Sequence, residues 1–402
     1  MHALLEYLGV TLSMVMLLII TNYSLVVFMR DVIHIEEEQL YTVAERIIDK
    51  ILLTPGYPPD WGSNFDEYNA TLYDFGLAKY ESRTPYELDI DKVIRLMNLT
   101  QLPNPLLVNG NEVSTLLGLD ESYGFKLEIE PYIKCNIEVL EYDKILGKNF
   151  PVKIKIKLMN YFGAGIPFAK VNVAYIAIGV KPGVGGEEPV EIKIAILKYS
   201  VTNLTGECIV DLRSEVEKYA RESNFGQESK LLSVIIPYVN WHDIRIANIY
   251  AESESATPLV GYVVGNYLIL QANLSLIPQG ATLMKNEVLQ VMPSCESLLP
   301  VEISELLPND TEAPPAYYVI NRGAFKYKVF RLDHIEDTTS HIIAIGQWLG
   351  GIVPIVVSRL PEVNISYGGE ARSPANVVVL TRLAYISGFP YIVRFSLWRL
   401  SE

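Results

Sequence analysis

A long apolar stretch at the start of the chain constrains the fold more than any other feature. Residues Ala3 to Phe28 contain one acid, Glu6, and one polar cluster at residues 21–24. A bilayer core requires roughly 20 apolar residues in helical form, so the stretch is long enough to span one. It lacks the basic region and the small-residue cleavage site of a secretory signal. We therefore expect a retained transmembrane helix.

The helix is expected to continue beyond the apolar stretch. From Met29 to Leu53, apolar residues recur near the helical period of 3.6, with the acids of residues 36–38 mostly on the other face. Thr54-Pro55-Gly56 then ends the helix, because proline cannot continue it and glycine permits the turn. The sequence predicts one helix of about fifty residues, with its second half forming a stalk outside the membrane.

The N-terminal run Ala3-Leu4-Leu5-Glu6-Tyr7-Leu8, followed by this helix, resembles the class III signal segment of archaeal type IV pilin-like proteins. The segments at 52–62 (LLTPGYPPDWG), 75–78 (FGLA) and 88–92 (LDIDK) are similar to runs common in such surface proteins. The resemblance covers about the first hundred residues. Family precursors carry a basic, glycine-ending leader, whereas only Met1 precedes His2 here. Either the leader is missing from this sequence or the segment is an uncut signal anchor.

The resemblance implies a role for Glu6. In the family, an acid at the fifth mature position pairs with the amino terminus of a neighbouring subunit during assembly. Glu6 has that position if His2 is the first mature residue. An acid in an apolar helix is costly and tends to mark a partner or a function. The alternative is that Glu6 lies near enough to the helix start to reach the headgroup region.

Charge and cysteine content exclude some classes of protein. The 402 residues carry a formal net charge of −14, which argues against nucleic acid as a partner. Cys135, Cys208 and Cys295 form no CxxC pair, so we expect no zinc site. One disulfide among the three is compatible with an exterior location, and the sequence does not select the pair.

Asparagine sequons indicate an exterior location. The pattern N-x-S/T occurs seven times, where chance would give about two. One of the seven, at Asn22, lies in the apolar helix. The alternative explanation for the set is that the patterns occur by chance in a cytoplasmic protein. We expect a glycosylated exterior region with the amino terminus inside. The predicted glycosylation sites are Asn69, Asn98, Asn203, Asn273, Asn309 and Asn364.

Residues 55–122 are expected to form a loop-rich helical collar. Thr84-Pro85-Tyr86-Glu87 is typical of a capping box, which predicts a helix from Thr84 to about Asn98, and a second helix is expected near residues 111–117. The segment from Asp66 to Tyr80 is rich in aromatic residues. If exposed, it is the expected subunit contact, through Tyr68, Tyr73, Phe75 and Tyr80.

From Tyr123 the hydrophobic period changes to two, as in strands that bury one face. Turn sequences at 160–173 and 201–212 resemble those of carboxypeptidase-regulatory or transthyretin-like β-sandwiches, which implies a spacer or adhesive module without catalysis. A helix is expected at 211–221 and a buried strand at 262–270. Further short strands follow, and residues 382–399 read as a terminal hairpin tied into a sheet.

The predicted fold class is α+β, mostly β. It consists of a long N-terminal transmembrane and stalk helix, a small helical collar and two β-rich, sandwich-like domains. The predicted boundaries are 1–54 for the helix, 55–122 for the collar, 123–277 for the β-sandwich and 278–402 for the C-terminal domain.

Catalytic patterns are weak. His334, Asp337 and His341 form the tightest cluster, but their spacing matches no zinc motif, and His242 at a strand end reads as structural. The glycine-rich residues 181–189 lack the residues of a phosphate-binding loop and read as a hairpin loop. We therefore expect no catalytic residue, metal or cofactor.

The sequence favours a non-enzymatic cell-surface protein, a minor or capping pilin-like subunit or an adhesin. Its location would be the cell membrane with an extracellular head, or an extracellular filament. Expected partners are other pilin-like subunits or membrane partners through the N-terminal helix, and surface glycans. One alternative is a membrane-anchored solute or glycan receptor, which requires a concave aromatic pocket. Another is an anchored hydrolase, which requires a histidine to converge with acids.

Overall fold

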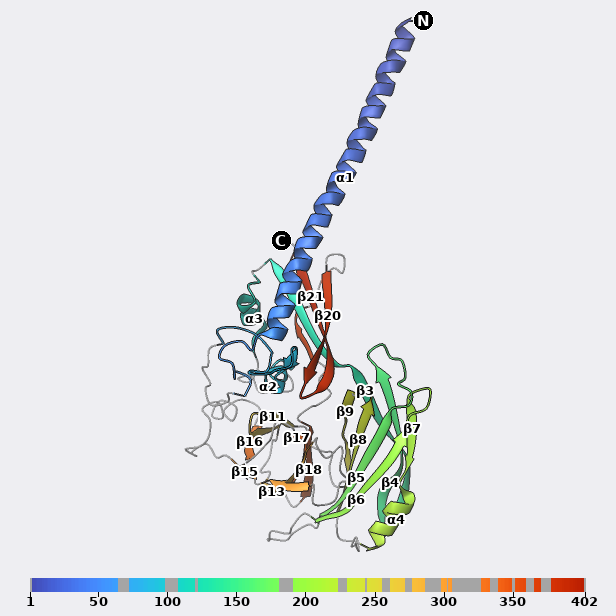
Figure 1. The fold of residues 1–402 in the computed structure, drawn as a ribbon, viewed down its shortest axis with the longest axis vertical. Coiled ribbons are helices and arrows are strands. Elements are labelled where there is room, and N and C mark those ends of the chain that lie inside the picture. The colour runs from blue at the N-terminus through green and yellow to red at the C-terminus, as the bar shows by residue number, and fades with distance from the viewer. Residues whose placement is uncertain are drawn as a thin grey trace.

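A long helix projects from a β-rich head in this computed structural model (Figure 1). The helices are α1 (His2–Leu53), α2 (Ile90–Ile94), α3 (Gly110–Leu116) and α4 (Arg213–Glu222). The structure describes residues 2–63, 72–97, 108–119, 122–180, 191–222, 230–242, 244–254, 261–271, 277–285, 298–301, 303–305, 327–332, 339–348, 351–358, 365–369 and 377–400. The mostly β character expected from the sequence is confirmed.

Helix α1 contains 52 residues, which corresponds to about 78 Å at a rise of 1.5 Å per residue. Within the part of the chain that the structure describes, no helix has both the length and the apolar character needed to cross a membrane. The predicted transmembrane helix in residues 1–54 is therefore corrected. Polar side chains interrupt the apolar stretch, and the hydroxyls of Ser13 and Thr21 donate to the carbonyls of Gly9 and Leu17.

The last two strands of the chain lie at the centre of the sheet nearest α1. β20 (Val377–Ile386) and β21 (Phe389–Arg399) form a hairpin around Ser387 and Gly388, which both have positive φ. The sheet order is β1-β20-β21-β2-β19, with β1 at Glu87–Leu88, β2 at Tyr123–Pro131 and β19 at Ile365–Gly368. The prediction that the chain end is tied into a sheet is confirmed. This sheet joins segments from three of the predicted domains, whose boundaries stay predictions.

A β-sandwich follows, built from two sheets that share one hydrophobic cluster. On β4 the even-numbered residues from Val152 to Leu158 are fully buried, whereas Lys153, Lys155 and Lys157 form ion pairs with glutamates. The alternation expected from period two is confirmed. One sheet has the order β3-β4-β7 and the other β10-β8-β5-β6, with β9 also paired to β8. The bounds are β3 Ile133–Ile145, β4 Lys148–Asn160, β5 Lys170–Val180, β6 Glu191–Val201, β7 Glu207–Asp211, β8 Lys230–Trp241, β9 Ile244–Ala247 and β10 Tyr250–Ser253.

The sheet that contains β5 and β8 is buried on both faces. One face belongs to the shared cluster of the sandwich, through residues such as Val173 and Tyr175. The opposite face forms a second cluster, made of Ala174, Ile176, Ile178, Leu232, Val234, Ile236 and Tyr238. Strands buried on both sides read as continuous apolar runs, as β8 does. The predicted helix at 211–221 is confirmed as α4, with Val216 and Ala220 buried.

Within the described residues, two further sheets have four strands each. One has the order β11-β12-β16-β15 and the other β14-β13-β17-β18. The single strand expected at 262–270 is in fact the β11–β12 hairpin, because Gly265 has a φ of 55° and reverses the chain there. The bounds are β11 Gly261–Val264, β12 Tyr267–Gln271, β13 Ile277–Lys285, β14 Leu298–Val301, β15 Ile303–Glu305, β16 Tyr327–Leu332, β17 Thr339–Trp348 and β18 Gly351–Ser358.

The first collar helix begins later than the capping box predicted. Tyr86 has a φ of 60°, and Glu87, the first residue of β1, pairs with Tyr385 of β20. This segment is therefore a turn leading into a strand. Helix α2 starts at Ile90, and the Asp89 side chain caps it by accepting from the Asp91 N–H at 2.9 Å. The second predicted helix is confirmed as α3, capped by Asn109.

Candidate functional site

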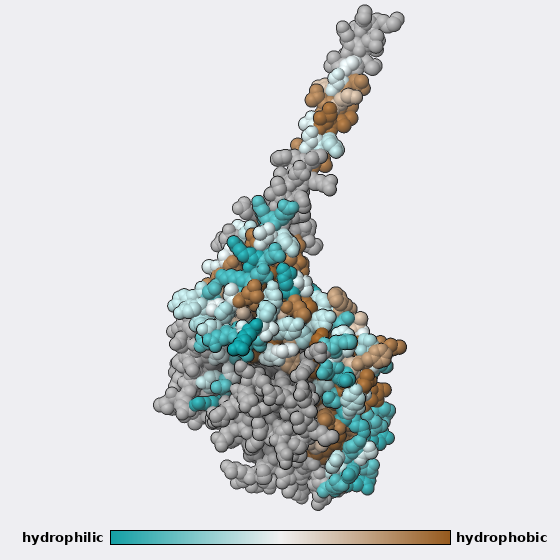
Figure 2. Space-filling model, viewed as in Figure 1, coloured by the Kyte–Doolittle hydropathy of each residue, from teal (hydrophilic) through white to brown (hydrophobic). Residues whose placement is uncertain are grey.

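The upper part of α1 is exposed and apolar around its whole circumference. Seven consecutive residues, Met14 to Ile20, are each between 52% and 68% exposed. Seven residues make nearly two helical turns, so they point in every direction around the axis. Figure 2 shows these apolar side chains on the helix beyond the head. Soluble proteins rarely expose so much contiguous apolar surface unless a partner covers it.

The lower part of α1 is built into the head. Its buried face contacts the β20–β21 hairpin, and Arg382 of β20 forms an ion pair with Glu45 at 3.5 Å. Lys50 forms an ion pair with Asp74 at 2.7 Å and donates to the Leu116 carbonyl of α3. The head therefore holds the helix from several sides. The buried residues of this face are Leu40, Ala44, Ile47, Ile48, Ile51 and Leu52.

The segment Phe75–Ala78 caps the end of α1. The last carbonyls of a helix have no partner within the helix. Here the Leu77 N–H donates to the Ile51 carbonyl at 2.8 Å, and the Ala78 N–H donates to the Thr54 carbonyl at 3.1 Å. Gly76 is required at this approach, since a Cβ there would lie 2.1 Å from the Thr54 oxygen.

Lys92 of α2 ties the helix end to this capping segment. Its ammonium is fully buried and donates to the Pro55 carbonyl at 2.9 Å and to the Ala78 carbonyl at 2.8 Å. Burial lowers the pKa of Lys92 below its ordinary value of 10.5, opposed by the nearby carboxylates of Asp89, Asp60 and Asp91.

Trp61 also links the end of α1 to the capping segment. Its indole N–H donates to the carbonyls of Pro55 and Gly76, and the Arg95 guanidinium lies 5.8 Å from the ring centroid. A Cβ at Gly62 would lie 2.5 Å from the backbone nitrogen of Lys92. The three sequence runs at 52–62, 75–78 and 88–92 thus form one unit, which we call the junction.

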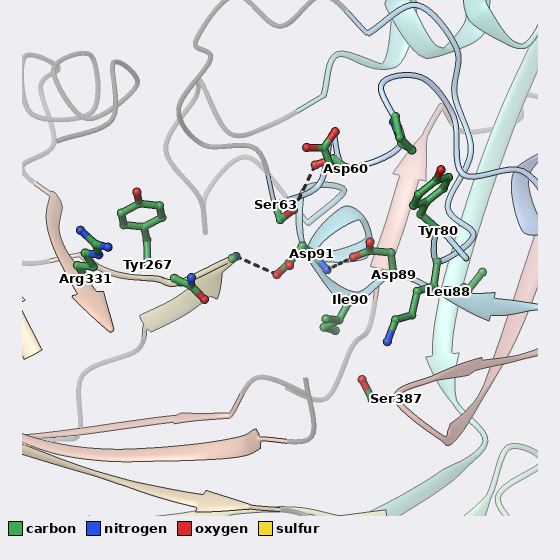
Figure 3. Close-up of a pocket in the computed structure, with 14 residues that line it drawn as sticks. Asp60, Ser63, Tyr80, Leu88, Asp89, Ile90, Asp91, Tyr267, Arg331 and Ser387 are labelled. Atoms are coloured by element: carbon green, nitrogen blue, oxygen red, sulfur yellow. Dashed lines mark hydrogen bonds between the residues drawn. The ribbon is translucent and has the colours of Figure 1, made fainter. Parts of the chain in front are cut away.

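A cavity of about 470 Å³ lies beside the junction (Figure 3). Tyr267 and Arg331 are at one end and Tyr80 at the other. Two of its three aspartates already have structural roles, because Asp89 caps α2 and Asp91 accepts from the Gly265 N–H at 3.1 Å. The lining is polar, in contrast to the aromatic concavity that a receptor requires.

The predicted site residues are scattered. Glu6 lies in α1, in a part of the helix whose side chains the structure does not describe. Asn203 lies on an exposed turn. Cys135 and Cys208 are buried and are not joined to each other by a disulfide. In the predicted contact at 66–80, Tyr73 and Tyr80 are exposed while Phe75 is buried. Outside the described residues lie Tyr68, Asn69, Asn98, residues 181–189, Asn273, Cys295, Asn309, His334, Asp337 and Asn364.

Two of the histidines that were weighed as catalytic alternatives lie within the described residues. His242 packs edge-on against Trp241, with the ring centroids 4.9 Å apart. His341 lies in β17, where the structure does not describe its side chain. Among the described residues, no three His, Cys, Asp or Glu side chains gather as metal ligands.

The sequence predicts the helix end at Thr54-Pro55-Gly56 and a family resemblance for the three runs, but it does not predict that the runs pack into one unit. The close-approach glycines and a lysine after LDID were the available signals. No protein-family model and no curated protein matches the chain. The likeness to archaeal pilin-like proteins therefore stays a prediction.

Proposed function

We propose that this chain is a non-enzymatic structural subunit that assembles with copies of itself through α1 and displays its head outside the cell. The observation that carries the proposal is the all-round apolar exposure of residues 14–20. A pairwise contact would cover only one side of such a helix. A bundle of several α1 helices surrounds each one, which buries the whole circumference.

The junction supports this proposal. A filament of helices requires every head to leave its helix at the same angle. The capping segment Phe75–Ala78 and the buried Lys92 fix that angle through hydrogen bonds to the last carbonyls of α1 and to Pro55. In such a bundle the resemblance assigns Glu6 to the contact with a neighbouring amino terminus.

The proposal is tested with filaments sheared from the surface of the native cells and identified by intact mass and N-terminal sequencing. The wild-type chain is expected in the filament fraction. Leu18→Glu is expected to be lost from it, because a charge buried between helices is costly without a partner. Leu140→Glu, on the exposed face of β3, is the matched control and is expected to assemble normally.

Two outcomes would contradict the proposal. One is a wild-type chain recovered only as a monomer. The other is recovery only with membrane lipid and never in sheared filaments. Normal assembly of Leu18→Glu would also sink the assignment of the interface to residues 14–20.

A further inference from the structure

Three large apolar side chains are exposed on two touching turns at one end of the sandwich. Phe162 is 83% exposed, Phe168 67% and Leu204 75%. The turns at 160–169 and 202–207 meet so closely that a Cβ at Gly165 would lie 2.1 Å from the Thr205 oxygen. An exposed apolar patch on a secreted head calls for something that covers it.

The sequon Asn203-Leu204-Thr205 lies on the second of these turns, and the exposed Leu204 is its middle residue. The Phe168 N–H donates to the Thr202 carbonyl at 3.0 Å, which places Phe168 beside the sequon. The buried Thr202 hydroxyl donates to the Ile166 carbonyl at 2.7 Å, and the Ala169 N–H donates to that hydroxyl. The turn is therefore fixed against the loop that carries Phe168.

The Asn203 side chain is held in one orientation. Its Oδ1 accepts from the Thr205 N–H at 2.9 Å, the Thr205 hydroxyl at 2.7 Å and the Glu207 N–H at 2.9 Å. Its Nδ2 makes no hydrogen bond to any residue that the structure describes, and the residue is exposed. The amide nitrogen, which is the atom that accepts a sugar, is thus the one left available.

We infer that Asn203 is N-glycosylated and that the attached oligosaccharide covers the apolar patch formed by Phe162, Phe168 and Leu204. Sugar rings present C–H faces that pack against apolar side chains, so the chain carries its own cover for this patch. The inference rests on the exterior location that is part of the proposed function.

The reaction is a glycosyl transfer. The Asn203 Nδ2 forms a bond to the anomeric carbon of an oligosaccharide carried on a polyprenyl phosphate. The bond between that carbon and the phosphate oxygen breaks, and its electron pair leaves with the phosphate. The amide nitrogen gives up one proton, which the released phosphate takes up, and no group is oxidised or reduced.

The test is glycopeptide mass spectrometry of the full chain purified from its native cells. The wild-type peptide containing Asn203 is expected to carry a glycan. Asn203→Asp keeps an oxygen that can accept the three hydrogen bonds but removes Nδ2, so it should fold and lose the modification. Thr205→Ala should also lose it, whereas Thr205→Ser should retain it.

The covering role has its own readout. Asn203→Asp is expected to bind more of a fluorescent hydrophobic dye than the wild type, and adding Phe168→Ser and Leu204→Ser should abolish that increase. An unmodified wild-type peptide overturns the inference, and unchanged dye binding overturns the covering role. An unmodified Asn203 on chains in sheared filaments rejects this inference alone. A modified Asn203 on chains never found in filaments rejects the assembly proposal alone.

Discussion

At the scale of single residues, the junction depends on two residues whose roles a sequence pattern rarely reveals. Gly76 is needed for its lack of a Cβ, and Lys92 for a buried charge that reaches two carbonyls. An unpaired buried acceptor costs about 1–3 kcal/mol. Both residues therefore fix one geometry for the end of α1.

Gly76→Ala is expected to destabilise the head severely, by about 3 kcal/mol or more, because the new Cβ cannot be placed without moving the Thr54 backbone. Gly110→Ala is the matched control, since nothing lies within 4 Å of a Cβ there. It should be neutral or stabilise by up to about 1 kcal/mol. Denaturant unfolding followed by tryptophan fluorescence measures both. Equal unfolding midpoints would contradict this account of the junction.

Residue identities gave part of this site in advance. The break at Thr54-Pro55-Gly56, where α1 ends, can be read from the chain. The predicted N-cap at Thr84 was wrong, because Asp89 provides the cap and Glu87 joins a strand. A capping box shows only that a helix could start there, and the pairing with β20 decided otherwise.

At the scale of elements, α1 has two halves with different roles. Residues 40–52 contribute a buried stripe to the head, whereas residues 14–20 are exposed on all sides. The amphipathic period predicted the first role correctly. The apolar run beyond the head was interpreted as a membrane span, and that interpretation was wrong for the described residues.

Ile51→Ala is expected to cost about 2–5 kcal/mol of unfolding free energy, because the Ile51 side chain is fully buried in the main hydrophobic cluster. Leu53→Ala, two positions along the same helix, removes a side chain that is 50% exposed and should cost under about 1 kcal/mol. Chemical denaturation of the full chain in mild detergent compares them. Similar losses for both variants would mean that the lower helix is not part of the folded head.

Local patterns identified most described strands but not their partners. The alternation on β2 and β4 fixed which face is buried. The β11–β12 hairpin was predicted to be one strand, because the run around Gly265-Asn266 is apolar on both sides. In the structure these two residues form the turn between the strands. The Gly265 N–H donates to Asp91, a contact across 174 positions that no local window contains.

At the scale of the whole molecule, the head is layered, with the β5–β8 sheet buried on both faces. Several tyrosines are enclosed within these layers, among them Tyr175, Tyr238 and Tyr391. Burial raises the pKa of each above its ordinary value of 10.0. The folded protein therefore keeps phenolic protons that the unfolded chain would release.

Stability is accordingly expected to fall as pH rises above 10. There the unfolded chain binds fewer protons than the folded protein, and each buried tyrosine contributes a loss of about 1.4 kcal/mol per pH unit. Lys92 acts in the opposite direction, because its pKa is lowered on folding, but it is one group against three. Urea unfolding between pH 9 and pH 11.5 tests this, and Tyr391→Phe should reduce the slope. A flat profile would contradict the burial of these phenols.

The pairing of β21 between β20 and β2 has a mechanical consequence. If the chain assembles through α1 as proposed, a subunit is pulled along that helix whenever its head meets drag. That tension enters the head through the junction and passes directly into the hairpin of the C-terminal strands, which α1 contacts. The strands of this sheet must shear past one another together before the helix can be extracted.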